Sequence, residues 1–164
     1  MAIKFSKTNI KYGCFSNFFS SDVTFDGLTY KNNEAAWQAQ KTLDTKQREA
    51  FTKLSPSDAK KAGRGKLALH DENGNNLGCI QLRADWEEVK YQLMVDVCLA
   101  KFTQNTALRD ILLSTGNEEL IENTTGWHDN IWGNCECPKC ISKVGQNLLG
   151  KALMEVRETL RKQA

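Results

Sequence analysis

The residues between Gly126 and Gly150 include several side chains of the kinds that bind metals or take part in catalysis. His128, Asp129 and Trp132 lie in this segment together with three cysteines and four glycines. The segment has no helical or strand periodicity, and it is too polar and too rich in glycine to form a core. Loops of this kind on a rigid scaffold often carry functional residues. We therefore expect it to form one half of an active site, with the other half upstream.

The three cysteines of this loop are spaced C-x-C-x-x-C, and a histidine precedes them. The four residues are Cys135, Cys137, Cys140 and His128. In a reducing compartment such a cluster favours a metal over disulfides, and these side chains suit tetrahedral Zn²⁺. His70 is the only other histidine and the alternative fourth ligand. Three reduced cysteines without a metal are the competing interpretation.

A zinc ion at this place would be structural, because three thiolates leave it little Lewis acidity. It would brace the loop and aim Asp129 and Trp132. The remaining cysteines are isolated in the sequence, and we expect them to be inert, partly buried thiols. They are Cys14, Cys79 and Cys98.

A second group of reactive side chains lies on a predicted helix near the N-terminus. Asn33 is a suitable N-cap, and the residues from Glu34 to Lys41 favour helix. Helical spacing puts Glu34, Trp37 or Gln38, and Lys41 on one face, with Glu34 in the electropositive first turn. This face would either line a cleft or form a solvated surface with an ion pair.

The elements around these residues can be predicted from turn and cap signals. Asp26-Gly27 indicates a type I′ hairpin between residues 23 and 30, and residues 67–82 carry a second hairpin signal. A helix starts at Ser55-Pro56 and stops at Gly63-Arg64-Gly65, where Arg64 would meet a phosphate or simply solvent. Before the first hairpin, Phe15–Phe19 reads as a hydrophobic plug in which Asn17 makes a turn hydrogen bond.

Three helices are predicted in the second half of the chain. Asp85 and Glu88 form a capping box for the longest helix, with Trp86 at its mouth as either core or binding wall. Asn105 begins a short helix, and an apolar stripe from Leu149 to Leu160 marks the last one. We therefore expect an α+β fold, a single helix-dominated domain over residues 1–164 with a small antiparallel sheet from the hairpins.

Composition agrees with an ordinary globular domain. The 164 residues are 40% hydrophobic and 26% charged, with a net charge of +2. That charge gives no argument for a surface that coats nucleic acid, although a nucleotide ligand remains compatible with it. No apolar run approaches the roughly 18 residues of a membrane span, and the N-terminus resembles no signal peptide. We expect a cytoplasmic protein.

Eight collinear segments of the sequence resemble the NADAR (YbiA-like) family, and the resemblance covers nearly the whole chain. The segments are FSNFF at 15–19, EAAWQAQK at 34–41, Arg64 after Gly63, ADWEEVKYQLM at 84–94, AKFTQN at 100–105, LLSTG at 112–116, DNIWG at 129–133 and GQNLLGKALMEVR at 145–157. The resemblance implies a YbiA-like N-glycosidase fold with metal-free chemistry. Some members cleave ribosylamine intermediates of riboflavin synthesis, and others remove ADP-ribose from the amino group of guanine.

Nine positions match the family's site motifs. They are Asn17, Phe18, Glu34, Lys41, Arg64, Trp86, Asp129, Trp132 and Asn147. The sequence departs from the family at Ala35-Ala36-Trp37, where many members carry His and aromatic residues, and at residues 70–81, which resemble an extra hairpin. Both departures bear on which substrate the protein uses and leave the expected class of reaction unchanged.

The chemistry of a ribosyl C1′–N bond assigns roles to these residues. Cleavage gives the ribose oxocarbenium character, so two complementary carboxylates are required, and Glu34 and Asp129 would supply them. Lys41 offers a second route through a Schiff base with the ring-opened C1′. Trp86 and Trp132 would stack on the base or ribose, and Arg64 would bind phosphate.

The predicted activity is removal of ADP-ribose from ADP-ribosylated guanine, in nucleic acid or in a nucleotide. The groups from the helix at 34–41 and from the loop at 126–150 are expected to face each other across a cleft. Hydrolysis of a ribosylaminopyrimidine phosphate of riboflavin synthesis is one alternative. A non-catalytic ADP-ribose or nucleotide reader is the other, with Glu34 and Asp129 binding ribose hydroxyls. No organic cofactor is expected.

Overall fold

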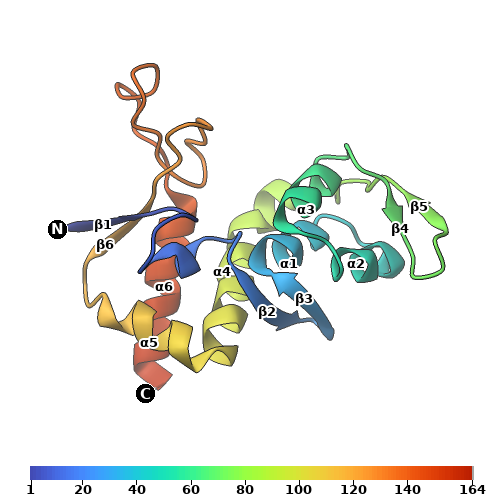
Figure 1. Ribbon diagram of the computed structural model, residues 1–164, viewed down its shortest axis with the longest axis horizontal. Coiled ribbons are helices and arrows are strands. Elements are labelled where there is room, and N and C mark those ends of the chain that lie inside the picture. The colour runs from blue at the N-terminus through green and yellow to red at the C-terminus, as the bar shows by residue number, and fades with distance from the viewer. Residues whose placement is uncertain (164) are drawn as a thin grey trace. The chain divides into compact units, whose positions relative to one another are not determined.

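The computed structural model describes residues 1–163, and its contacts divide them into two compact units (Figure 1). Unit 1 comprises Met1–Ser16 and the residues from Asn105 onward, and unit 2 comprises Asn17–Gln104. Among the described residues, no helix is both long enough and apolar enough to cross a membrane. The α+β class predicted from the sequence is confirmed by the structure.

Unit 2 begins with the predicted hairpin. Strands β2 (Ser20–Phe25) and β3 (Leu28–Asn32) pair antiparallel, and Asp26 and Gly27 have φ angles of 50° and 83°. Positive φ at both central residues is the type I′ geometry, which matches the twist of the strands. The hairpin lies against α1 (Asn33–Ala39) and α4 (Trp86–Gln104), as Figure 1 shows.

The rest of unit 2 consists of short elements. Helices α2 (Thr45–Phe51) and α3 (Pro56–Gly63) are followed by an antiparallel pair, β4 (Leu69–His70) and β5 (Asn76–Gly78). Helix α3 packs on α1 and strand β4 contacts α2. The second hairpin and the Ser55-Pro56 helix start are confirmed, whereas α2 was not predicted.

Unit 1 is built on its last helix. Strand β1 (Ala2–Phe5) pairs parallel with β6 (Glu119–Glu122), and a 3₁₀ turn, η1, spans Gly13–Phe15. Helices α5 (Thr106–Ser114) and α6 (Leu148–Gln163) pack together, and α6 also covers β6. The predicted apolar stripe of α6 is fully buried and forms the core of this unit.

Five details differ from the sequence predictions. The hairpins form separate two-stranded sheets, and the parallel β1–β6 pair was not expected. The N-cap of α1 is Asn32, not Asn33, because the Asn32 side chain accepts the Ala35 N–H at 2.7 Å. Helix α1 ends at Ala39, so Lys41 follows the helix instead of ending it. Cys79 is exposed, whereas Cys14 and Cys98 are buried as thiols of inert type should be.

Candidate active site

The amine of Lys41 lies beside two tryptophan rings. Lys41 Nζ is 5.2 Å from the centroid of the Trp37 ring and 5.6 Å from that of Trp86. The two rings are 5.1 Å apart with an interplanar angle of 55°. The amine also donates to the Gly63 carbonyl at 3.4 Å. An ammonium gains cation–π attraction from such rings, so the residues around Lys41 form a cage of aromatic and carbonyl groups.

Two hydrogen bonds to main-chain carbonyl groups fix this cage in unit 2. The Arg83 N–H donates to the Lys41 carbonyl at 2.9 Å, which ties the end of α1 to the approach to α4. The Trp37 indole N–H donates to the Lys90 carbonyl within α4 at 3.1 Å. Both Trp37 and Trp86 are only 6% exposed. Trp86 is therefore a buried core residue that also forms one wall of the cage around Lys41.

The surroundings of Lys41 lower its pKa. Burial disfavours the charged amine and lowers the pKa from its usual 10.5; the Glu34 carboxylate opposes this, and the positive charges of Arg64 and Lys90 add to it. A larger share of Lys41 is therefore the neutral amine than for an exposed lysine at the same pH. A neutral amine is the form that can act as a nucleophile.

Glu34 occupies the first turn of α1, where the helix dipole favours a carboxylate. It is 7% exposed, and the Gln38 side-chain amide donates to its Oε1 at 2.8 Å. Its main-chain N–H donates to the Asn17 carbonyl at 3.0 Å. The carboxylate is thus held by Gln38 of its own helix, and the Glu34 main chain by the segment before the hairpin.

Gln38 links Glu34 to α3. Its buried Oε1 has no hydrogen-bond partner among the described residues, and a Cβ placed on Gly63 would lie 1.8 Å from it. Only a glycine allows the Gln38 amide to pack this closely against α3. Gly63 therefore contacts both Lys41, through its carbonyl, and Gln38, through its missing side chain.

The other predicted site residues of unit 2 have different surroundings. Asn17 Oδ1 accepts from the Asn33 side chain at 2.8 Å, so this amide supports the start of α1. Its Nδ2 lies 3.6 Å from Met94 Sδ, a weak acceptor. Phe18 is half-buried, and Arg64 is exposed at the C-cap of α3. Arg64 acts on Lys41 through its charge.

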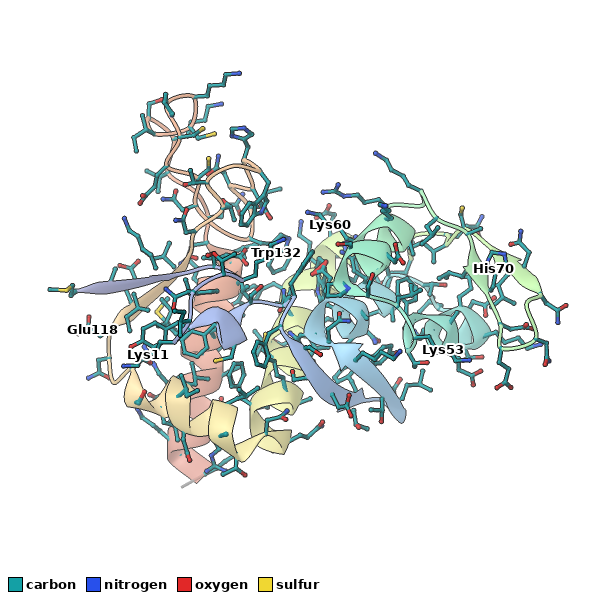
Figure 2. All side chains as sticks on the ribbon, viewed as in Figure 1. Lys11, Lys53, Lys60, His70, Glu118 and Trp132 are labelled. Carbon is teal, nitrogen blue, oxygen red and sulfur yellow. The ribbon has the colours of Figure 1, made fainter. Side chains whose placement is uncertain are left out.

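In unit 1, the half-buried Asp129 organises its own loop. Asp129 Oδ1 accepts the N–H groups of Ile131 and Trp132, both at 2.9 Å. The Thr124 hydroxyl donates to the Asp129 carbonyl at 2.6 Å. The Trp132 carbonyl in turn accepts the Leu149 N–H at 3.0 Å, near the start of α6. Trp132, labelled in Figure 2, is half-buried at the base of this loop.

Asn147 joins the end of the loop to β6. It has a φ of 51°, a left-handed conformation that asparagine tolerates. Its Nδ2 donates to the Leu120 carbonyl at 2.8 Å, and its Oδ1 accepts the Glu122 N–H at 3.0 Å. Both ends of the amide are engaged by one strand, so the contacts of Asn147 are those of a positioning residue.

The four predicted metal ligands come together in this loop. His128 Nδ1 and the sulfurs of Cys135, Cys137 and Cys140 all lie within 4.8 Å of one another. Such a group can hold a metal ion. Hydrogen bonding within the cluster lowers the pKa of Cys135 to about 6; burial is the largest single influence and acts in the opposite direction, but contacts with Cys137, His128 and Cys140 outweigh it.

Of the residues predicted from the sequence, Glu34, Lys41 and Trp86 come together in unit 2. The positive charge of Arg64 also acts on Lys41 there. One loop brings Asp129, Trp132 and Asn147 together in unit 1. Sequence reasoning assigned no role in the site to Trp37, Gln38 or Gly63. The helical stripe through Glu34 and Lys41 already pointed to Trp37 and Gln38, whereas no sequence signal distinguishes Gly63 as a packing partner.

Comparison with known proteins gives a consistent match over the whole chain. The NADAR domain model matches residues 4–161. N-glycosidase YbiA of Escherichia coli K12 is 38% identical over 159 residues, which are 96% of this chain and 88% of YbiA. The NMR structure of E. coli YbiA has a TM-score of 0.77 and 37% identity, and the match covers 99% of this chain and 86% of that chain.

Two further relatives are similar over nearly the full length of this chain. N-glycosidase Npun_R5314 of Nostoc punctiforme is 35% identical, over 98% of this chain and 94% of its own. The riboflavin biosynthesis protein VVA0006 of Vibrio vulnificus is 32% identical over 99% of this chain, but only 39% of that protein is matched. The relatives named as N-glycosidases make this protein an enzyme of the hydrolase class. With a family match that runs from residue 4 to residue 161, the chain belongs to the NADAR domain family.

Proposed function

We propose that this enzyme hydrolyses the C1′–N bond that joins ADP-ribose to the amino group of guanine, in nucleic acid or in a nucleotide. One observation carries the proposal. The Lys41 amine, with a lowered pKa, lies beside the rings of Trp37 and Trp86, and the charge of the buried Glu34 acts on it. A nucleophilic amine beside a carboxylate is the arrangement that Schiff-base catalysis at a ribosyl carbon needs.

The first half of the proposed reaction transfers the ribosyl group to Lys41. The furanose opens as the guanine nitrogen forms a C1′=N bond and the C1′–O4′ bond breaks. O4′ takes up a proton from solvent, and the C1′=N nitrogen carries the positive charge. Neutral Lys41 Nζ then attacks C1′. Glu34 carries a proton from Nζ to the guanine nitrogen, and the C1′–N bond breaks with its electron pair on that nitrogen. The base amine leaves, and C1′ remains as a Schiff base on Lys41.

The second half returns the enzyme to its starting state. Glu34 accepts a proton from water as the oxygen adds to C1′, and passes a proton to Nζ. The C1′–Nζ bond then breaks with its electrons on nitrogen. The new C1′ hydroxyl gives up its proton to solvent as C1′=O forms, which balances the proton that O4′ took up. ADP-ribose leaves and its ring closes, and Lys41 is again a neutral amine. The net change is the addition of one water across the C1′–N bond.

Three further predicted residues are proposed to bind the substrate, and a fourth, Asp129, to act in catalysis. Arg64 is exposed and positively charged, so it is suited to a phosphate. Phe18 and Trp132 are half-buried, and each has an aromatic surface suited to a base or ribose. Asp129 remains proposed as a second catalytic carboxylate. Because its Oδ1 already accepts two N–H groups, Oδ2 is the oxygen proposed to meet the substrate.

A direct assay with two variants tests the proposal. DNA that carries ADP-ribosylated guanosine is the substrate, and release of ADP-ribose is measured. Glu34→Gln should lower turnover by about 10²–10⁴-fold while it keeps ADP-ribose binding, because the amide cannot transfer protons. Lys41→Met should abolish turnover. Borohydride should trap a ribosyl adduct on Lys41 of the unaltered enzyme and none on Lys41→Met.

Two exposed residues of the same types provide matched controls. Glu88→Gln and Lys53→Met remove the same groups elsewhere in unit 2 and should leave turnover unchanged. Full turnover by Glu34→Gln would rule out its proposed role. Turnover without any trapped adduct would favour direct hydrolysis through an oxocarbenium-like transition state.

The name of the Vibrio vulnificus relative favours one alternative substrate, a ribosylaminopyrimidine phosphate of riboflavin synthesis. It contains the same C1′–N bond and one phosphate, so the same residues would serve. Parallel assays with this compound identify the preferred substrate by kcat/KM. Turnover of neither compound together with tight ADP-ribose binding would replace the enzymatic proposal with a nucleotide reader.

A further inference from the structure

We infer that His128, Cys135, Cys137 and Cys140 bind one Zn²⁺ ion in a closed, structural site. These four residues belong to unit 1, whereas Lys41 and the residues around it belong to unit 2. The proposal rests on the arrangement of the four ligand atoms and on how the loop delivers them.

The distances from His128 Nδ1 to the three sulfurs are nearly equal. Nδ1 lies 3.5 Å from Cys135 Sγ, 3.3 Å from Cys137 Sγ and 3.5 Å from Cys140 Sγ. A neutral imidazole has a single N–H and can donate it to only one of them. A hydrogen bond from this N–H can therefore account for only one of the three contacts.

A shared metal ion accounts for all three contacts. Zinc bonds sulfur at about 2.3 Å and nitrogen at about 2.0 Å, so a tetrahedral ion places the nitrogen about 3.5 Å from each sulfur. The observed contacts of 3.3–3.5 Å agree with this geometry. One nitrogen above three sulfurs is the arrangement of the four corners of a tetrahedron.

Local hydrogen bonds bring these four residues to one place. The Cys140 and Ile141 N–H groups both donate to the Cys137 carbonyl, at 2.9 and 2.8 Å, which closes a tight turn between two of the ligands. The Cys135 N–H donates to Asn130 Oδ1 at 2.9 Å. The His128 N–H donates to the Thr124 carbonyl at 3.1 Å. These hydrogen bonds bring ligands from three parts of the loop to one place.

The ligand set favours zinc and a structural role. Thiolate and imidazole ligands in tetrahedral geometry suit Zn²⁺, whereas Mg²⁺ and Ca²⁺ prefer oxygen ligands. Catalytic zinc sites keep a position open for water, but here four protein ligands fill the coordination sphere. Burial of Cys135 and Cys140 further encloses the site.

The metal would hold the loop segment that also contains Asp129 and Trp132, the two residues of this loop that are proposed to contact the substrate. Asp129 follows His128 directly, and Asn130, which bonds to Cys135, precedes Ile131 and Trp132. Zinc would thus limit the motion of Asp129 and Trp132. This consequence rests on the proposed function, but zinc binding itself does not.

Metal analysis of the full chain provides the primary test. The purified protein should contain one zinc per chain. His128→Asn should lower zinc affinity by more than about 100-fold, because changes to outer-shell partners alone cost roughly 10–100-fold. Asparagine tolerates the left-handed φ of 57° at this position, so the loss would come from the missing ligand and not from backbone strain. Cys140→Ser should have the same effect.

Cys79→Ser is the matched control, because Cys79 is an exposed cysteine outside the cluster. It should keep one zinc per chain. Cobalt titration of the metal-free protein should produce thiolate-to-cobalt charge-transfer bands and the visible bands of a tetrahedral ion, and circular dichroism should verify that each variant is folded. A folded protein without these bands, or with iron or no metal after purification, would overturn the proposal.

The link to function is measured separately. Removal of zinc with a chelator should reduce kcat/KM, and added zinc should restore it. Full activity of the metal-free enzyme would refute the bracing role while zinc binding stands. An inactive protein that binds zinc would contradict the proposed function alone.

Discussion

Opposing influences on the pKa of the Lys41 amine determine the pH at which it becomes a nucleophile. Burial lowers its pKa, the Glu34 charge raises it, and the charges of Arg64 and Lys90 lower it. As pH rises through the lowered pKa, the neutral amine accumulates. The ascending limb of the pH profile of kcat/KM should therefore have its midpoint below the ordinary lysine pKa of 10.5. The lowered pKa also links folding to pH. Between the pKa of folded Lys41 and 10.5, the unfolded chain holds more protons than the folded one, so the free energy of unfolding increases as pH rises.

Lys90→Gln should move this limb to higher pH. The substitution removes a positive charge that lowers the pKa of Lys41, and Lys90 has no proposed role in catalysis or binding. The measurement is the pH profile of kcat/KM. Lys53→Gln is the control, since Lys53 (labelled in Figure 2) is an exposed lysine that has no part in the pKa shift of Lys41. A profile that moves to lower pH, or does not move, would contradict the assignment of the limb to Lys41.

At the level of single residues, the sequence predicted the reactive groups better than their supports. Helical spacing placed Glu34 and Lys41 on one face, although Lys41 follows the helix. The role of Trp86 could not be decided from the sequence, because its partner Trp37 lies on another helix. Asn147 was predicted to bind substrate, but its amide is occupied by β6, a contact that depends on tertiary structure.

The contact between α1 and α3 depends on a residue without a side chain. Gly63→Ala would put a Cβ 1.8 Å from Gln38 Oε1 and 2.6 Å from its Cδ. Gln38 would have to move, and its hydrogen bond to Glu34 would be lost. We expect a loss of stability on the order of 1–3 kcal/mol from overpacking and a clear fall in kcat. Denaturant unfolding and steady-state kinetics measure the two effects.

A double variant separates the clash from its consequence. If the clash destabilises Gly63→Ala, then Gln38→Ala in the same chain should restore stability but not kcat, because the support of Glu34 is still missing. Lys61→Ala is the control on the same helix, at an exposed position. Equal stability and kcat in Gly63→Ala and the unaltered enzyme would show that Gln38 does not position Glu34.

Among the elements, most of those with local signals were predicted, although α2 was missed despite its Asp44 cap, and the strand pair with distant partners was not predicted. The Asp26-Gly27 hairpin and the stripe of α6 were recognised because turn chemistry and helical periodicity are local. The parallel pair β1–β6 joins Ala2–Phe5 to Glu119–Glu122, and nothing near either strand indicates the other. Such pairing depends on long-range contacts, which residue patterns do not encode.

At the scale of the whole molecule, the family match crosses the boundary between the two units. It extends from residue 4 to residue 161, while the contacts divide the chain after Ser16 and after Gln104. Both units supply residues with proposed roles. A unit of less than about 100 residues buries a smaller share of its surface than the complete chain, and its stability alone would be marginal. These facts favour the prediction of one domain over residues 1–164.

Calorimetry can test this prediction with one substitution in each unit. Leu153→Ala in unit 1 and Leu69→Ala in unit 2 each remove a side chain that is at most 2% exposed, at a cost of about 2–5 kcal/mol. In a single domain with zinc present, each variant should shift one common transition downward by several degrees. The van't Hoff and calorimetric enthalpies should agree. If the units unfold independently, each substitution will move only the transition of its own unit, and the van't Hoff enthalpy will fall well below the calorimetric one.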